Sequence, residues 1–548
     1  MDLATLRDTD VAALHAAADA YDGLRAALGQ NLEDWRGGVD QPLAASGWAG
    51  PAADAATPSL ALAAGELKAA QAEVGQLGKV LRAGADALVL ARSELHRALE
   101  DARTAGMSVT EHGAVTWEPA PYADRHDPDH RSIGERTATA LAARIATALA
   151  RADAVDRALA ARLRHYTARA LDGTGLDPDS AARDRLDPGL GVPALLRLAV
   201  PPDDAPPTEV YAWWNGLPAD EQQRLITDHP ELVGNRDGIP AAARDRANRI
   251  LLPRLLATYQ GHPPPLSDRD RLRLEGFRRI SARLAAAEGQ DPPVLLLGIG
   301  EEGQGRAVLS FGDPDTARDV TSLVGGMGTE LQRIGGGDAD RARAVYDAAR
   351  RADPTRSTAS IAWLGYDAPL GLDVASRTAA RAGADAYHRF LAGQRATHQG
   401  APAHVTAQGH SYGSLVVGLA AQRPGGLPAD DIVLVGSPGT GADHASDLGV
   451  GTDHVYVGAA AHDPVSWAPD PAALGPVARL PPNARWYGTD PASAEYGAHR
   501  FAVADGPLGP ATHSSYWDDG PGGDHASIDN IGRIVSGHGD RITTEHRR

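Results

Sequence analysis

The pentapeptide GHSYG at residues 409–413 has the residue types and spacing that a nucleophilic serine needs. It follows the β-branched run at 404–408 and precedes a small-residue apolar run at 414–421 with helical spacing. On such a strand-to-helix turn the serine takes a strained conformation that small flanking glycines permit, and the helix points N–H groups at a developing oxyanion. We therefore predict that Ser411 is a catalytic nucleophile. The alternative is a serine that merely lies between two glycines.

A nucleophilic serine requires a general base, and the base requires an acid that orients it. On α/β folds with this elbow the chain order is serine, then acid, then histidine. Asp463 follows directly after a strand-like run, and His513 opens a loop that leads to the final helical pattern. We predict that Asp463 orients His513 as the base. Other candidates are Asp443, Asp447, Asp453 and Asp470 for the acid, and His499, His525 and His538 for the base.

An oxyanion hole needs a second N–H donor, which this type of site takes from the loop after the third strand. The sequence SLVGGMGT at residues 322–329 has that place, and its glycines let the backbone approach a substrate. We predict that the N–H of Gly326 or Met327 acts together with the N–H of Tyr412. The alternative is an ordinary glycine-rich turn between a strand and a helix.

From about residue 290 short β-branched runs alternate with helical patterns, which predicts a mostly parallel sheet with helices on both faces. The first two strands lack an intervening helix and are expected to form an antiparallel edge hairpin. GIGEEG at 298–303 resembles a dinucleotide-binding loop but leads into a strand, so we exclude that site. The expected strands lie in 292–300, 306–313, 319–329, 358–369, 404–411, 431–439 and 454–464, and the helices in 338–352, 377–393 and 412–422.

The chain is expected to contain three segments. Residues 1–175 are predicted to be an all-α domain, with a helical hairpin at about 1–105 that glycine and proline interrupt at 47–51, and a further helix at 135–171. Residues 176–285 are expected to be a Pro- and Asp-rich linker and then short helices that dock on the next domain. The Pro- and Asp-rich stretch itself covers 172–208 and so begins just before this segment. Residues 286–548 are expected to be the catalytic α/β domain.

Composition excludes several classes of function. The 548-residue chain carries a net charge of −18, which disfavours nucleic-acid binding, and its lack of Cys excludes disulfides and thiolate chemistry. We find neither an apolar run of about 18 residues nor a basic and then apolar N-terminus, so we expect no transmembrane helix and no signal peptide. No HExxH or HxxxH spacing on a predicted helix indicates a metal site, and we expect no cofactor.

The turn of the hairpin contains Trp48, Ala49 and Gly50, and this segment resembles the WXG100 family of helical hairpins. That resemblance implies handling by a specialised actinobacterial secretion system, so the protein is expected to be cytoplasmic or exported by that route. It also implies a helical partner or self-association. The alternative is a helical packing module with a tryptophan buried at its turn.

Residues 290–548 resemble the actinobacterial α/β-hydrolase family called domain of unknown function 1023. The resemblance rests on motifs at 312–329, 362–369, 409–414, 435–441, 513–518 and 530–537, and on the helical segment 213–241. It implies an α/β-hydrolase fold with Ser411, Asp463 and His513 as the triad. We therefore expect a serine hydrolase that cleaves a carboxylic ester of a small or lipid-like acyl substrate. The alternatives are a catalytically silent, exported or scaffolding protein, and an amidase or acyltransferase on the same fold.

Overall fold

The computed structural model describes residues 1–118, 130–186, 192–262, 265–467, 484–519 and 524–546. The chain divides into two compact units. The helical unit comprises Met1–Ala205 and Asn215–Glu221, and the sheet unit comprises Pro206–Trp214 and Gln222–Arg548. We describe each unit by itself. The division into three segments expected from the sequence remains a prediction.

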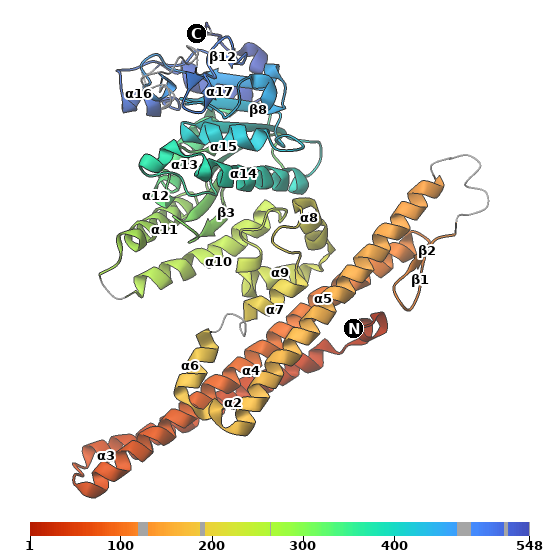
Figure 1. Cartoon of the computed structure of the whole chain (residues 1–548), viewed down its shortest axis with the longest axis vertical. Helices are drawn as coiled ribbons and strands as arrows, with labels where there is room; N and C mark the ends of the chain where they lie inside the picture. Colours follow the sequence, from red (N-terminus) through yellow and green to blue (C-terminus); the bar gives the residue numbers. More distant parts are fainter. Residues whose placement is uncertain (119–129, 187–191, 263–264, 468–483, 520–523, 547–548) are drawn as a thin grey trace, which may run out of the picture. The chain divides into compact units, whose positions relative to one another are not determined.

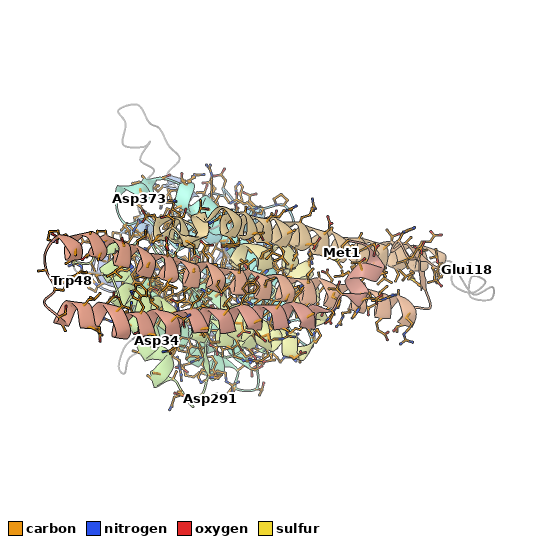
Figure 2. The ribbon with its side chains drawn as sticks, turned by 90° about the horizontal axis from the view of Figure 1, so that it is seen from below. Met1, Asp34, Trp48, Glu118, Asp291 and Asp373 are labelled. Atoms are coloured by element: carbon orange, nitrogen blue, oxygen red, sulfur yellow. The ribbon has the colours of Figure 1, made fainter. Side chains whose placement is uncertain are left out.

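Three long helices form the helical unit: α2 (Val11–Trp35), α4 (Pro51–Thr104) and α5 (His130–Asp172) (Figure 1). Helix α2 runs back along α4, and Figure 2 shows the two helices side by side up to the turn at Trp48. Glycine lets these two helices approach, since a Cβ atom on Gly78 of α4 would lie 3.3 Å from the Cβ of Tyr21 and 3.4 Å from the carbonyl oxygen of Ala18 in α2. The predicted pair of antiparallel helices is therefore present. Trp48 itself is 48% exposed, so the alternative of a buried tryptophan at the turn is wrong.

Shorter elements complete the helical unit. The stretch expected to be a linker instead contains two helices, and Leu195 and Leu196 in the second of them are fully buried. A two-stranded ribbon also follows α4. The short elements are α1 (Leu3–Asp8), η1 (Arg36–Asp40), α3 (Gln41–Ala45), β1 (Ser108–Val109), β2 (Val115–Thr116), η3 (Thr174–Leu176), α6 (Pro178–Leu186) and α7 (Val192–Ala199).

The sheet unit is built on an eight-stranded sheet with the order β12-β9-β8-β7-β5-β6-β4-β3. Strands β3 and β4 form the predicted antiparallel edge hairpin; β4 also pairs antiparallel with β6, and every other pairing is parallel. Each of the seven expected runs contains a strand, and the two-residue β12 was not expected. The strands are β3 (Val294–Gly300), β4 (Arg306–Phe311), β5 (Asp319–Val324), β6 (Thr358–Leu364), β7 (His404–His410), β8 (Asp431–Val435), β9 (Val455–Gly458) and β12 (His499–Arg500).

Helices cover both faces of this sheet, as the continuous apolar strands predict. Side chains alternate along β8, so that Val433 and Val435 pack with α13 (Gly337–Ala352) and α17 (Ala526–Val535). Ile432 and Leu434 belong to the core of the other face, with α14 (Thr378–Thr397) and α15 (Tyr412–Ala421).

Short helices precede the sheet and pack at its β3 edge. Trp213 and Trp214 are buried, and Asn248 donates hydrogen bonds to the carbonyls of Gly234 (2.7 Å) and Leu296 (2.9 Å). In the described part of the chain no helix is both long and apolar enough to cross a membrane. The other elements include α8 (Pro207–Gly216), α9 (Ala219–Asp228), η4 (Pro230–Leu232), α10 (Ala241–Gln260), α11 (Asp268–Ala286), α12 (Leu331–Ile334), η5 (Leu372–Ala375), the β10 (Ala484–Arg485) and β11 (Gly488–Thr489) ribbon, and α16 (Pro510–Ser514).

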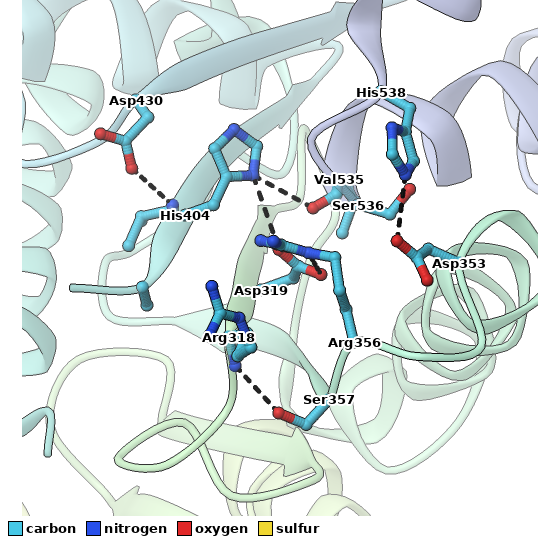
Figure 3. Close-up of polar contacts among 12 residues, drawn as sticks. Arg318, Asp319, Asp353, Arg356, Ser357, His404, Asp430, Val535, Ser536 and His538 are labelled. Atoms are coloured by element: carbon cyan, nitrogen blue, oxygen red, sulfur yellow. Dashed lines mark hydrogen bonds and ion pairs between the residues drawn. The ribbon is translucent and has the colours of Figure 1, made fainter. Parts of the chain in front are cut away.

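Charged side chains gather where the parallel strands begin (Figure 3). Asp319, the first residue of β5, is fully buried and pairs with the Arg356 guanidinium, whose Nε lies 2.8 Å from Oδ2. His404, the first residue of β7, lies 2.8 Å from Asp431 through Nε2 and 3.2 Å from the Val535 carbonyl through Nδ1. Burial lowers the pKa of His404, but Asp431 and the Val535 carbonyl outweigh that effect, so its pKa is raised. We call these five residues the strand-start cluster.

Candidate active site

Ser411 lies in a strained turn between β7 and α15. Its φ and ψ are 55° and −128°, and among the described residues it is the only one other than glycine with a positive φ. Such a conformation costs about 1–3 kcal/mol and persists only where the surrounding structure imposes it. The strain therefore marks Ser411 as a functional candidate on structural grounds alone.

The two glycines of the pentapeptide are required by close backbone contacts. A Cβ atom on Gly409 would lie 2.7 Å from the Cα of Ser414, one turn into α15. A Cβ atom on Gly413 would lie 2.1 Å from the carbonyl oxygen of Val324, the last residue of β5. Both distances are too short for any side chain, so α15 can begin this close to the sheet only with glycine at both positions.

The structure brings His513 and Asp463 together. His513 Nδ1 lies 2.9 Å from both carboxylate oxygens of Asp463, which is fully buried beyond the end of β9. Asp463 also accepts hydrogen bonds from the Tyr516 hydroxyl (2.7 Å) and the backbone N–H of Val465 (2.9 Å). Burial raises the pKa of Asp463. The hydrogen bonds and the charge of His513 have a larger, opposite effect, so the pKa of Asp463 lies below its ordinary value. The carboxylate is therefore ionised near neutral pH.

The same backbone segments hold Ser411 and the His513–Asp463 pair. The N–H of Ser411 donates to the carbonyl of Val435 at the end of β8 (3.1 Å). The next residue, Gly436, has a positive φ of 55°, and a Cβ atom there would lie 2.9 Å from the His513 ring and 2.8 Å from Asp463. Glycine at 436 thus leaves the space in which the imidazole and the carboxylate pack against the end of β8.

His410, immediately before the serine, fixes the backbone of His513. Its Nε2 lies 2.8 Å from the His513 carbonyl oxygen and donates a hydrogen bond to it. The two imidazole rings lie 4.6 Å apart, and the Trp517 ring packs edge-on against His410 at 4.9 Å. Burial, and then the charge of His513, keep the pKa of His410 well below its ordinary value. His410 is therefore a neutral donor that links the nucleophile turn to the loop carrying the histidine.

The glycine-rich loop after β5 approaches Ser411. A Cβ atom on Gly326 would lie 2.6 Å from the Cβ of Ser411 and 3.0 Å from its Oγ, so the backbone of this loop lies beside the hydroxyl. Tyr412 is the first residue of α15, and the first N–H groups of a helix have no partner within it. The side chain of Met327 points outward and is 49% exposed. The structure therefore places Gly326 beside Ser411 and Met327 next to Gly326 in the chain. Tyr412 follows Ser411 directly, at the start of α15.

The alternative acids and bases have other partners. His499 contacts Asp453 (3.2 Å), His538 contacts Asp353 (3.1 Å), Asp447 accepts from the His444 N–H (3.0 Å), and Asp443 accepts from Thr489 (3.4 Å). His525 lies directly before α17, and Asp470 lies outside the described residues. In the described ranges no group of three or more His, Asp or Glu side chains is arranged to hold a metal ion.

Sequence reasoning missed the contacts of His410 and Tyr516. Both residues stand inside motifs singled out above, GHSYG and HSSYW, and that neighbourhood was the only available signal. A motif does not show which neighbour supports the site, because the contacts cross between β7, the loop after β9 and the loop before α17.

Comparison with known proteins agrees with this architecture. A family profile described as alpha/beta hydrolase matches residues 301–473. Uncharacterized protein Rv0963c of Mycobacterium tuberculosis (strain H37Rv) is 40% identical over 191 residues, which are 34% of this chain and 71% of that protein. Uncharacterized protein Rv2079 of the same strain is 33% identical over 416 residues, which are 68% of this chain and 61% of that protein. This chain belongs to one family with Rv0963c, and it contains an alpha/beta hydrolase domain.

This match does not extend over the whole of the longer relative. The aligned region spans 61% of the length of Rv2079. The relatives therefore add no activity to the alpha/beta hydrolase domain found here, and the substrate has to be argued from this chain's own residues.

Proposed function

We propose that this protein is a serine hydrolase that cleaves carboxylic esters through Ser411, His513 and Asp463. The observation that carries the proposal is the strained turn of Ser411, whose N–H donates to the end of β8, where a histidine hydrogen bonded to a buried, ionised carboxylate also packs. Nucleophile, base and orienting acid come in the chain order typical of the alpha/beta hydrolases. Three independent features thus support one chemistry.

The hydrogen bond to Asp463 sets the roles of the two His513 nitrogens. Because Nδ1 donates to the carboxylate, Nε2 of the neutral imidazole carries the lone pair, and we assign to it the acceptance of the serine proton. The histidine takes the proton of Ser411 as Oγ attacks the acyl carbonyl, and Asp463 stabilises the imidazolium that forms. The alcohol leaves with that proton. Water, deprotonated by His513, then cleaves the acyl-enzyme and releases the acid and Ser411.

Backbone donors stabilise the charge that develops on the carbonyl oxygen. We assign this role to the N–H of Tyr412 and to that of Gly326 or Met327, since the loop after β5 approaches the Ser411 hydroxyl. The positive end of the α15 dipole acts in the same direction. Removal of one such donor typically costs about 10²–10³ in turnover.

Labelling with a fluorophosphonate tests the activated serine. We expect one adduct, mapped by mass spectrometry to Ser411, and none with Ser411→Ala. His513→Ala should lose both the adduct and most turnover of p-nitrophenyl butyrate, whereas His499→Ala, a histidine with its partner elsewhere, should keep both. Labelling that survives Ser411→Ala, or full turnover in His513→Ala, would overturn the proposal.

Amide cleavage and acyl transfer use the same groups, so products have to separate them. We expect hydrolysis of the ester to give free acid as the main product even when an alcohol or an amine is added as a competing nucleophile. Mass spectrometry of the products measures the fraction transferred. A dominant transfer product would reassign the protein as an acyltransferase.

We further propose that the α2–α4 hairpin is a WXG100-like module that binds a helical partner or a second copy. Trp48 at the turn is exposed, and so are Leu24 of α2 (48%) and Leu62 of α4 (60%). Export of the chain is tested by comparing cells and culture medium of the producing bacterium for the parent protein and Trp48→Ala. Recovery of both proteins only in the cells would favour the cytoplasmic alternative.

A further inference from the structure

A cavity of about 540 Å³ opens in the sheet unit beyond the end of β6. Its wall comes from three segments: the start of β4, the loop that follows β6, and the first turn of α14. None of Ser411, Asp463 and His513 lines it. Its volume lies within the range of small-molecule sites, about 300–1,000 Å³.

Hydrogen bonds connect the cavity wall to the segments around the serine. The Tyr366 hydroxyl, on the wall, donates to the carbonyl of Gly325 in the glycine-rich loop (2.8 Å). The Tyr412 hydroxyl donates to the carbonyl of Ser376, also on the wall (2.5 Å). Strand β6 is separated from β7 only by β5, and strands lie about 4.8 Å apart, which puts the strand ends roughly 10 Å from each other. An ester held at Ser411 spans that distance when its alcohol part is as long as a hexose.

The cavity wall carries hydrogen-bond donors and acceptors, and most of its charge is balanced because Arg306 pairs with Asp367. Arg306 Nη1 lies 2.7 Å from Asp367 Oδ1, which also accepts from the N–H of Gln304. Burial raises the pKa of Asp367, but Arg306 and that N–H together outweigh burial, so its pKa is lowered and the ion pair is intact at neutral pH. Asp373 contributes an exposed carboxylate, which the backbone of Gly371 caps at 2.8 Å. The wall therefore offers an ion pair and one further negative charge.

This chemistry selects among ligands. Tyr366, Ala379 and Ala382 give the cavity an apolar side on which the carbon skeleton of a ligand can pack. A purely alkyl ligand would remove water from the Arg306–Asp367 pair without replacing its hydrogen bonds, which is costly. An anionic group would be repelled by Asp373. Hydroxyl groups both donate and accept, so they can satisfy the guanidinium, both carboxylates and Thr378 at once. The side-chain oxygen of Gln304 adds a buried acceptor that has no hydrogen-bond partner among the described residues.

We propose that this cavity is a subsite for an uncharged, hydroxyl-rich part of the substrate, a polyol or a sugar. The proposal rests on the ester hydrolysis assigned to Ser411. The substrate is then an ester of a polyhydroxylated alcohol, and reaction with one water gives the free acid and the polyol. The acyl carbonyl lies at Ser411 while the hydroxyl groups of the alcohol occupy the cavity.

Binding measured without catalysis tests the subsite separately from the reaction. We expect methyl α-glucoside to show saturation-transfer NMR signals with the full-length Ser411→Ala protein, and cyclohexanol to show much weaker ones. Adding Asp373→Asn or Thr378→Val to Ser411→Ala should weaken glucoside binding about tenfold, because the first change removes the charge of an acceptor and the second removes a hydroxyl. Asp453→Asn, an exposed aspartate outside the cavity, should leave binding as it is. Glucoside binding that is absent, or unchanged by both cavity variants, would overturn the subsite.

Kinetics then connect the subsite to turnover. 6-O-Butyryl glucose and ethyl butyrate share their acyl group, so the ratio of their kcat/KM values measures recognition of the alcohol. We expect the parent to prefer the glucose ester and Asp373→Asn to lower that preference about tenfold, with the thermal unfolding of the variant unchanged. A preference that Asp373→Asn and Thr378→Val leave intact would contradict the subsite. Hydrolysis that survives Ser411→Ala would instead refute the proposed function, while the NMR result would still decide the subsite.

Discussion

Replacement of Ser411 by glycine should give a more stable protein than replacement by alanine, although both changes abolish turnover. Alanine keeps the Cβ atom and with it the strain of a φ of 55° and a ψ of −128°. Glycine releases that strain, which is worth about 1–3 kcal/mol for a residue in a sparsely populated conformation. Glycine also gains freedom in the unfolded chain, which costs about 0.5–1 kcal/mol. The net expectation is that Ser411→Gly is more stable than Ser411→Ala by roughly 1 kcal/mol, within a range of about 0–2.5 kcal/mol.

A matched pair of variants isolates the strain. Gln399 lies exposed in a loop, and its backbone φ is not positive. At that position glycine should be less stable than alanine by about 0.5–1 kcal/mol, through the unfolded chain alone. The sign of the glycine–alanine difference should therefore reverse between residues 399 and 411.

Urea unfolding followed by hydrogen exchange of peptides from β7 and β8 provides the measurement, because it reports the sheet unit rather than the whole chain. If Ser411→Gly is less stable than Ser411→Ala by the same margin as the pair at Gln399, no strain is stored at the serine. The structural argument for a nucleophile turn would then fail.

Three further predictions concern the triad, the turn and the strand starts. Asp463→Asn should lower turnover of p-nitrophenyl butyrate about 10⁴-fold, since the amide favours the wrong His513 tautomer, and a loss below tenfold would contradict its role. Gly413→Ala should destabilise the sheet unit by about 1–3 kcal/mol in urea unfolding, because its Cβ would lie 2.1 Å from a carbonyl oxygen of β5; unchanged stability would refute that contact. The raised pKa of His404 means that its pairing with Asp431 stabilises the fold below the unfolded pKa of about 6.5 and is lost as pH rises through the folded value. His404→Gln should therefore lose most stability under mildly acidic conditions and least at alkaline pH, and a deficit that grows with pH would contradict this.

The strands of the sheet were predictable from the sequence because each is buried on both faces and reads as a continuous apolar run. The pair of Asp463 and His513 was predictable for a different reason: the chain order of the fold restricts where an acid and a base can stand. Both predictions use short local patterns, and the topology of the fold then determines which of these patterns lie next to each other.

The rest depends on contacts that no local pattern shows. Pro178 and Pro207 begin helices, where proline is favoured in the first turn, and were read as signs of a linker. Strand β12 has two residues and no apolar run. His410 and Tyr516 support the site through contacts to distant loops. The cavity beyond β6 was missed because its wall comes from three separate segments.

The length of α4 has a consequence for the local stability of the helical unit and for how it meets a partner. At 1.5 Å per residue its 54 residues extend about 80 Å. Between residues 51 and 68 only Ala53 is buried, whereas buried positions recur from Gly75 to Ala102. The first part, which contains Pro58, therefore depends on the helix propensity of its many alanines. The second part is stabilised by the packing of its buried face. Amide protection should rise along this one continuous helix, so the end beside Trp48 can melt and re-form on a partner while the other end stays folded.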